Sequence, residues 1–151
     1  MPPAPKLNFS ELLLRADLAG VVRLPSESRQ AIADSARSLG FFWAEADLSG
    51  VRSKEDFLAA IAEAMYFPAW FGENWDALGD CLVDMSWSNA DGYVLLLLGA
   101  DQFHAHAPDE FLTALAVLSD ASATWAHDEV PFWVFVDQVA DGLQLLKAQP
   151  D

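Results

Sequence analysis

Three aspartates spaced four residues apart form a concentrated set of charged side chains. Asp76, Asp80 and Asp84 would lie about one turn apart on one face of a helix, with Glu73 just before its first turn. Each neighbouring pair of like charges costs a helix roughly 0.2 to 0.5 kcal/mol, and only Asp76 is well placed for the helix dipole. No lysine or arginine is close to them in the sequence. This pattern predicts carboxylates that bind something outside the fold.

Enzymatic uses of these residues are weakly supported. Glycoside hydrolysis needs two acids in a cleft, whereas Asp76 and Asp80 would lie on the convex face of one helix. Cys81 could act as a nucleophile with a histidine as its base. The candidate bases are His104, His106 and His127. Cys81 falls among apolar helix positions and beside acidic residues, so we interpret it as a structural cysteine, and we expect no enzymatic activity.

Metal and nucleic-acid sites have equally weak signals. His104 and His106 could bind zinc together with Asp101 and Asp109, but nothing else is spaced to complete a site of three or four ligands. Exposed loop histidines are the simpler interpretation. The aromatic residues near the aspartates could stack on bases, but nucleic-acid platforms combine stacking with basic grooves. We therefore expect no metal, no cofactor and no nucleic acid.

Charge is distributed very unequally along the chain. The 151 residues contain 23 acidic and 8 basic residues, a net charge of -15. The first 52 residues contain equal numbers of acids and bases, so residues 53–151 carry all of the net charge. Lys54 and Lys147 are the only bases in that part. Such a field repels nucleic acid and anionic lipid and attracts basic proteins, although solubility alone would also explain it.

The composition indicates one folded domain over residues 1–151. A hydrophobic content of 53% in 151 residues supports a core and excludes disorder. The longest clean apolar run, Tyr93 to Leu98, is far shorter than the roughly 20 residues of a membrane span. The N-terminus lacks the pattern of a signal peptide, and the single cysteine excludes an internal disulfide framework. We therefore expect a cytoplasmic protein that does not enter a membrane.

The stretch from Tyr66 to Met85, which reads YFPAWFGENWDALGDCLVDM, must position the aspartates. Pro68 and Gly72 predict a loop that redirects the chain, and Asn74 is the expected N-cap of the helix that follows. One face of that helix is apolar and should be buried. It consists of Trp75, Leu78, Cys81, Leu82 and Met85. The aspartates would then lie on a different, solvent-facing side.

The segment PAWFGENWDALGDCL, residues 68–82, resembles the signature segment of the barstar family, the intracellular protein inhibitors of barnase-type ribonucleases. In that family the aromatic loop, the Gly-Glu-Asn turn and two aspartates one helical turn apart form the surface that closes the ribonuclease active site. The resemblance implies that the corresponding residues bind the partner here. They are Trp70, Gly72, Asn74, Asp76 and Asp80. The regular spacing of the three aspartates adds Asp84 to this predicted surface.

Two further positions are compared with the family. Gly79 stands where barstar has a tryptophan just before the second aspartate, and a glycine there costs a helix interior about 1 kcal/mol relative to alanine. A glutamate that the family supplies from the helix before the last strand corresponds by offset to Asp120. We include both Gly79 and Asp120 in the predicted partner-binding surface.

The expected fold is α/β and barstar-like, with a small parallel sheet of three core strands packed with helices. The predicted strands are 41–48, 93–98 and 131–136, and the predicted helices are 53–65, 74–85 and 109–122. Residues 101–108 are expected to form a loop. Residues 41–138 would form the barstar-like core, and residues 1–40 an N-terminal extension with one added β-α unit. Ser10 is the expected cap of a short helix in that extension.

The resemblance and the charge together predict an inhibitor of a basic, barnase-type ribonuclease. The acidic helix and its loop would occupy the enzyme's active site, with Asp80 replacing a phosphate, Asp76 flanking it, and Trp70 and Asn74 supplying shape and hydrogen bonds. The alternative is an acidic adaptor or nucleic-acid mimic that blocks another basic protein through the same surface. Residues 1–40 would either extend the sheet or form a dimer, and the oligomeric state is left open.

Overall fold

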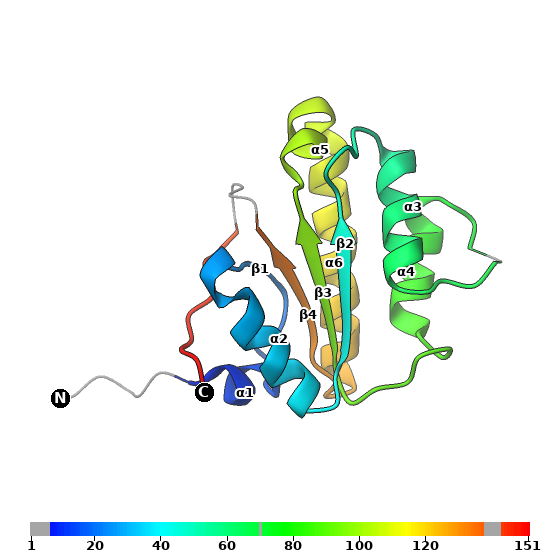
Figure 1. Ribbon diagram of the computed structural model, residues 1–151. Coiled ribbons are helices and arrows are strands. Elements are labelled where there is room, and N and C mark those ends of the chain that lie inside the picture. The colour runs from blue at the N-terminus through cyan, green and yellow to red at the C-terminus, as the bar shows by residue number, and fades with distance from the viewer. Residues whose placement is uncertain (1–6, 70, 138–142) are drawn as a thin grey trace.

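The protein is built on one sheet of four parallel strands. The computed structural model describes residues 7–69, 71–137 and 143–151. The strands are β1 (Val21–Arg23), β2 (Phe42–Asp47), β3 (Tyr93–Leu98) and β4 (Phe132–Val136). They lie in the order β1-β4-β3-β2, so that β2, β3 and β4 form the expected three core strands and β1 extends them at the far edge (Figure 1). The predicted α/β fold with a parallel sheet is confirmed.

Helices cover both faces of the sheet. The first face carries α1 (Phe9–Leu13) and α2 (Arg29–Ser38), which follows the short 3-10 turn η1 (Ser26–Ser28). The second face carries α3 (Lys54–Ala64), α4 (Trp75–Asp84), α5 (Asp101–His106) and α6 (Pro108–His127). Figure 1 shows α2 in front of the sheet and α6 behind it. None of the helices in the described ranges has the length and apolar character that a membrane crossing requires.

The central strand β3 is apolar throughout because both of its faces are covered. Val94 and Leu96 contribute to the core beneath α1 and α2, whereas Leu95 and Leu97 contribute to the core beneath α3 to α6. All four side chains are at most 1% exposed. This two-sided burial explains why the run from Tyr93 to Leu98 shows no polar alternation.

The N-terminal segment completes the sheet and covers its first face. β1 pairs with β4, for example Val21 with Val134, so residues 7–40 extend the sheet, which was one of the two predicted alternatives. We call residues 7–40 the N-terminal layer. The C-terminal segment returns to this layer, where the Phe9 N–H donates to the Gln149 carbonyl oxygen at 2.9 Å. The carboxylate of Asp151 accepts hydrogen bonds from the N–H and hydroxyl of Ser10.

Two local predictions are wrong. Residues 101–106 form helix α5 rather than a loop, because the His104 N–H bonds to the Ala100 carbonyl oxygen and the side chain of Phe103 is fully buried. Two helices therefore separate β3 from β4. The cap of α1 is Asn8, not Ser10: the Asn8 side chain accepts from the Glu11 N–H at 2.8 Å, and the Glu11 carboxylate accepts from the Asn8 N–H at 3.1 Å.

Candidate functional site

The loop before α4 is held by its own aromatic residues, by Trp87, which follows α4, and by the predicted cap. The rings of Phe67 and Phe71 meet edge to face at 5.0 Å, and the indole of Trp87 donates to the Met65 carbonyl oxygen at 3.1 Å. Glu73 has φ +54, so this residue makes the left-handed turn into the helix. These contacts fix where α4 begins. The predicted contact residue Trp70 lies outside the described residues.

Asn74 begins the helix as predicted. Its side-chain oxygen accepts a hydrogen bond from the Ala77 N–H at 2.8 Å, and its amide nitrogen donates to the Gly72 carbonyl oxygen at 3.3 Å. The side chain of Asn74 is therefore already used to cap α4 and to hold the turn at Gly72. Both residues are exposed at the entrance to the helix, so their backbone and shape are available to a partner.

Indole hydrogen bonds fix α4 against α6 at both ends. The indole of Trp75, at the start of α4, donates to the Glu110 carboxylate of α6 at 3.2 Å. The indole of Trp125, near the end of α6, donates to the Leu82 carbonyl oxygen at 2.8 Å. The predicted apolar face of α4 is buried, with Leu78, Cys81, Leu82 and Met85 all at 0% exposure and Trp75 half-buried. The outer face of α4 is therefore held on a rigid support.

Asp76, Asp80 and Asp84 lie on that outer face, and all three are exposed. We call these three residues the aspartate ridge. Among the described residues, none of their carboxylates accepts a hydrogen bond or forms an ion pair with a basic group within 4.0 Å. The ridge therefore carries three negative charges that the described part of the fold does not neutralise.

A hollow on the α3 side of the ridge contains Lys54, a base that the sequence did not place near the aspartates. Lys54, at the start of α3, lines this hollow together with Asn74, Asp76 and Asp80. No lysine or arginine is close to the aspartates along the sequence, but the fold places Lys54 in the same hollow, although no ion pair forms within 4.0 Å in the described structure. Nothing in the sequence links Lys54 to α4, because the packing of α3 beside α4 brings them together.

A groove on the other side of the ridge runs between α4 and α6. It brings together the predicted residues Asp76, Gly79, Asp80 and Asp120. It also contains residues that the sequence analysis did not select. These are Trp75, Val83, Val117, Ala121 and Thr124. A signal for the α6 wall is present in the sequence, since residues 117, 120, 121 and 124 share one face of a helix. The predicted residue Asp84 does not line this groove.

The alternative chemistries receive no support from the geometry. Cys81 is fully buried, and its burial, followed by the nearby charges of Asp84 and Asp80, raises the pKa of its thiol above the ordinary range. His104 and His106 belong to α5 rather than to a loop, and the ring of His104 stacks on Phe111 at 4.5 Å. Across residues 7–69, 71–137 and 143–151, no group of three or more His, Cys, Asp or Glu side chains is arranged to hold a metal ion.

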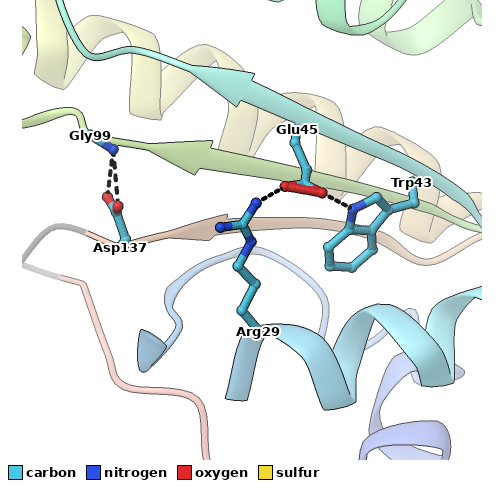
Figure 2. Close-up of polar contacts among 5 residues, drawn as sticks. All are labelled: Arg29, Trp43, Glu45, Gly99 and Asp137. Carbon is cyan, nitrogen blue, oxygen red and sulfur yellow. Dashed lines mark hydrogen bonds and ion pairs between the residues drawn. The ribbon is translucent and has the colours of Figure 1, made fainter. Parts of the chain in front are cut away.

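Two acidic side chains elsewhere in the molecule, Glu45 and Asp137, are hydrogen-bonded within the fold. Figure 2 shows Glu45, on β2, accepting from the guanidinium of Arg29 on α2 and from the indole of Trp43 at 3.0 Å. The hydrogen bond from Trp43 is the largest cause that lowers the pKa of Glu45, and Arg29 adds to it. The carboxylate of Asp137 accepts from the Gly99 N–H at 2.9 Å. These acids contrast with the unpaired aspartate ridge.

Comparison with known proteins agrees with the resemblance seen in the sequence. A family model described as Barstar (barnase inhibitor) matches residues 41–137, which run from the start of β2 past the end of β4. Comparison with curated proteins finds no match. The matched segment contains the aspartate ridge and both walls of the groove, and it leaves out the N-terminal layer and the C-terminal segment. Because the match spans well over half of the chain, this protein belongs to the barstar family of barnase inhibitors.

Proposed function

We propose that this protein inhibits a basic, barnase-type ribonuclease by placing α4 and its preceding loop in the enzyme's active site. The observation that carries the proposal is the aspartate ridge, with three exposed carboxylates that have no partner in the described residues. A ribonuclease binds phosphates with arginine, lysine and histidine side chains. A carboxylate on a rigid helix supplies the same charge to those side chains.

The rigidity of α4 supports this use of its carboxylates. The Asn74 cap and the two indole hydrogen bonds, from Trp75 to Glu110 and from Trp125 to Leu82, fix the helix before any partner arrives. A preorganised surface loses little conformational entropy on binding, so more of its interaction energy appears as affinity. The helix is therefore suited to tight binding rather than to adapting to many partners.

The geometry suggests distinct roles along this surface. Asp80 lies mid-helix between the two hollows and is assigned to replace a phosphate, with Asp76 flanking it. Asp120 reaches the same groove from α6, and Asp84 extends the negative charge toward the end of α4. Gly72 and Asn74 shape the approach to the helix, and Trp70 is assigned to the same contact by the family resemblance. The protein itself performs no reaction and needs no cofactor, and it acts in the cytoplasm.

Titration against a barnase-type ribonuclease tests this proposal. Residual RNA cleavage should fall to near zero when the inhibitor and the enzyme are present at about a one-to-one ratio, as expected for a tight complex. The matched control is a variant with Asp76→Asn and Asp80→Asn, which keeps the shape of α4 and should inhibit far less. Cleavage that the wild-type protein leaves unaffected would overturn the proposal and favour an acidic adaptor that blocks a different basic protein.

A further inference from the structure

The strand β2 forms one edge of the sheet, and its outer side is open (Figure 1). On its inner side, the Phe42 N–H donates to the Gly92 carbonyl oxygen at 2.9 Å. Backbone groups of a parallel strand point alternately to its two sides, so those of Trp43, Glu45 and Asp47 point away from β3. Within residues 7–69, 71–137 and 143–151, no hydrogen bond reaches these outward N–H and carbonyl groups. Three residues of β2 therefore keep free backbone donors and acceptors.

The opposite edge of the sheet is covered by the chain itself. The Arg23 N–H of β1 donates to the Gln144 carbonyl oxygen at 2.8 Å, and the Leu146 N–H donates to the Arg23 carbonyl oxygen at 2.9 Å. The edge at β2 has no such cover among the described residues. β2 has six residues in continuous register with β3 and contains no proline, so it lacks the bulge or proline that commonly blocks an exposed edge. It therefore presents a regular template for one more strand.

A hollow of about 430 Å³ lies along this edge, between β2 and α3. Its apolar walls are made of small side chains. These are Ala44, Ala46, Ala60 and Ala64. Tyr66 also lines the hollow, and its side chain is 71% exposed although its ring meets that of Phe42 edge to face at 6.3 Å. The second face of the sheet thus offers space and apolar surface to side chains of an added strand.

The charges along the edge are mainly negative. Glu45 and Asp47 carry their side chains on the first face of the sheet, and Glu63 of α3 lines the hollow on the second face. Arg29 is the base that pairs with one of them, Glu45, as Figure 2 shows. Pairing β2 with a second copy of itself would bring these acids together in two chains that each carry a net charge of -15. The edge is therefore complementary to a basic strand rather than to another copy of this protein.

We propose that the open edge of β2 binds an extended strand of a partner protein in which apolar and basic residues alternate. Its backbone pairs with Trp43, Glu45 and Asp47. Its apolar side chains fill the hollow over Ala44 and Ala46, and its basic side chains meet the carboxylates of Glu45 and Asp47 on the other face. This hollow shares no lining residue with the two hollows beside the aspartate ridge, so the inference does not rest on the proposed function.

The first test uses a peptide probe of the proposed chemistry, acetyl-Lys-Val-Lys-Val-Lys-Val-Lys-amide, with the full chain. The comparison peptide is N-methylated at its three central residues, which removes backbone donors from both of its edges and keeps its charge. Amide hydrogen exchange is followed by proton-nitrogen spectra. The first peptide should slow the exchange of Trp43, Glu45 and Asp47 in a saturable way, and the N-methylated peptide should not. Equal protection by both peptides, or protection by neither, overturns the proposal.

A matched pair of variants at position 45 sharpens this test. Glu45→Pro removes the outward N–H, and it breaks no bond to β3 because that N–H points away from the sheet. Glu45→Gln loses the same charge and the same ion pair with Arg29 but keeps the N–H. Glu45→Pro should bind the peptide at least about tenfold more weakly than Glu45→Gln. Equal affinities of the two folded variants would contradict the proposal.

Two further measurements keep the proposal testable. If Glu45→Pro does not fold, Ala60→Leu fills the hollow from α3 and should weaken peptide binding, whereas Ala59→Leu, at an exposed position of α3 outside the hollow, should not. Equal binding by these two variants would overturn the proposal. Sedimentation of the free chain tests the other occupant: its mass should not depend on Glu45→Pro. A dimer that Glu45→Gln keeps and Glu45→Pro loses would assign the edge to a second copy and overturn the proposal.

Discussion

The N-terminal layer and the α4-α6 surface use acidic residues in opposite ways. The three ion pairs found among the described residues each involve an arginine of the N-terminal layer: Arg15 with Asp17, Arg29 with Glu45, and Arg37 with Asp34. The aspartate ridge has no such pair. In the N-terminal layer, arginines therefore neutralise individual acids beside the sheet, whereas the ridge where we propose that a partner binds keeps three neighbouring acids unpaired among the described residues.

The two regions also differ in what they contribute to stability. Exposed ion pairs are worth only about 0 to 1 kcal/mol each, so the N-terminal layer stabilises the protein mainly by covering apolar side chains. Phe9, Leu13 and Ile32 pack over Trp133 and Phe135 of β4 in one buried cluster. The α4-α6 surface instead carries unfavourable repulsion within its ridge. The first region therefore provides stability, and the second carries unfavourable repulsion at the surface where we propose that a partner binds.

Removing the N-terminal layer should have the largest effect. A fragment of residues 41–151, which lacks the N-terminal layer, would expose four apolar side chains of β3 and β4. These are Val94, Leu96, Trp133 and Phe135. At about 1.5 to 3 kcal/mol each, their exposure costs about 6 to 12 kcal/mol, which is comparable with the whole stability of a typical domain. We expect the fragment to lose cooperative unfolding in denaturant, with the full chain as the control. A fragment that unfolds at the same denaturant concentration as the full chain would show that the layer is dispensable.

The second largest effect should be on binding. Asp80→Ala should weaken the complex with the ribonuclease by more than about 2 kcal/mol, because it removes an unpaired charge at the centre of the proposed contact. Asp34→Ala, an exposed acid of the N-terminal layer 3.8 Å from Arg37, is the matched control and should change affinity little. Affinities measured by inhibition of RNA cleavage decide the matter. Equal losses in the two variants would place the contact elsewhere.

A smaller effect is expected for the paired acid Glu45. Its hydrogen bond from Trp43 and its ion pair with Arg29 lower its pKa in the folded protein, so it adds stability above its unfolded pKa of about 4.3. Glu45→Gln should therefore lower the free energy of unfolding by about 0.5 to 1 kcal/mol at neutral pH. The expected loss is this small because the side chain of Glu45 is partly exposed and solvent screens its ion pair. The difference in stability between the wild-type protein and Glu45→Gln should vanish as the pH falls through the lowered pKa of Glu45. Denaturant melts at several pH values measure it, with Glu27→Gln as an unpaired control. A difference that is constant with pH would exclude the ion pair as its cause.

The smallest effect should be a gain in stability. Asp80→Asn removes the repulsion with Asp76 and with Asp84, at roughly 0.2 to 0.5 kcal/mol each, so the free protein should become more stable by up to about 1 kcal/mol at low salt. Lys54, which lines the adjoining hollow, reduces this gain. Added salt should reduce it further. Denaturant melts at two salt concentrations test this, and a destabilised variant would mean that the carboxylate holds a structural contact.

The sequence predicted the elements whose signals are local. The strand Tyr93–Leu98 was predicted to the residue because its apolar run is bounded by Gly92 and Gly99. The start of α4 followed from Asn74, whose cap depends only on neighbouring backbone. Helix α5 was missed because only Phe103 of its side chains is buried, so its six residues carry too little periodicity to predict a helix.

Features that depend on packing between helices could not be predicted. Periodicity shows which face of α4 is buried, but it does not show which helix lies beside the other faces. Lys54 from α3 and Val117 from α6 therefore entered the candidate site only when the helices were placed. The anchoring of Gln149 on residues 7–9 was missed for the same reason, because this pairing joins the two ends of the described chain.

The pairing of distant segments in the N-terminal layer has a consequence for protein synthesis. Residues 7–40 leave the ribosome before β4 and Gln149, but β1 pairs with β4, and Asn8 pairs with Gln149. At about 5 to 20 residues per second, the apolar side chains of α1 and α2 stay uncovered for on the order of 5 to 20 s. We therefore expect the layer to be the last part to fold during translation, and to need protection by a chaperone. Proteolysis of arrested nascent chains should cleave within residues 7–40 before β4 has emerged and should spare them once residue 149 has emerged.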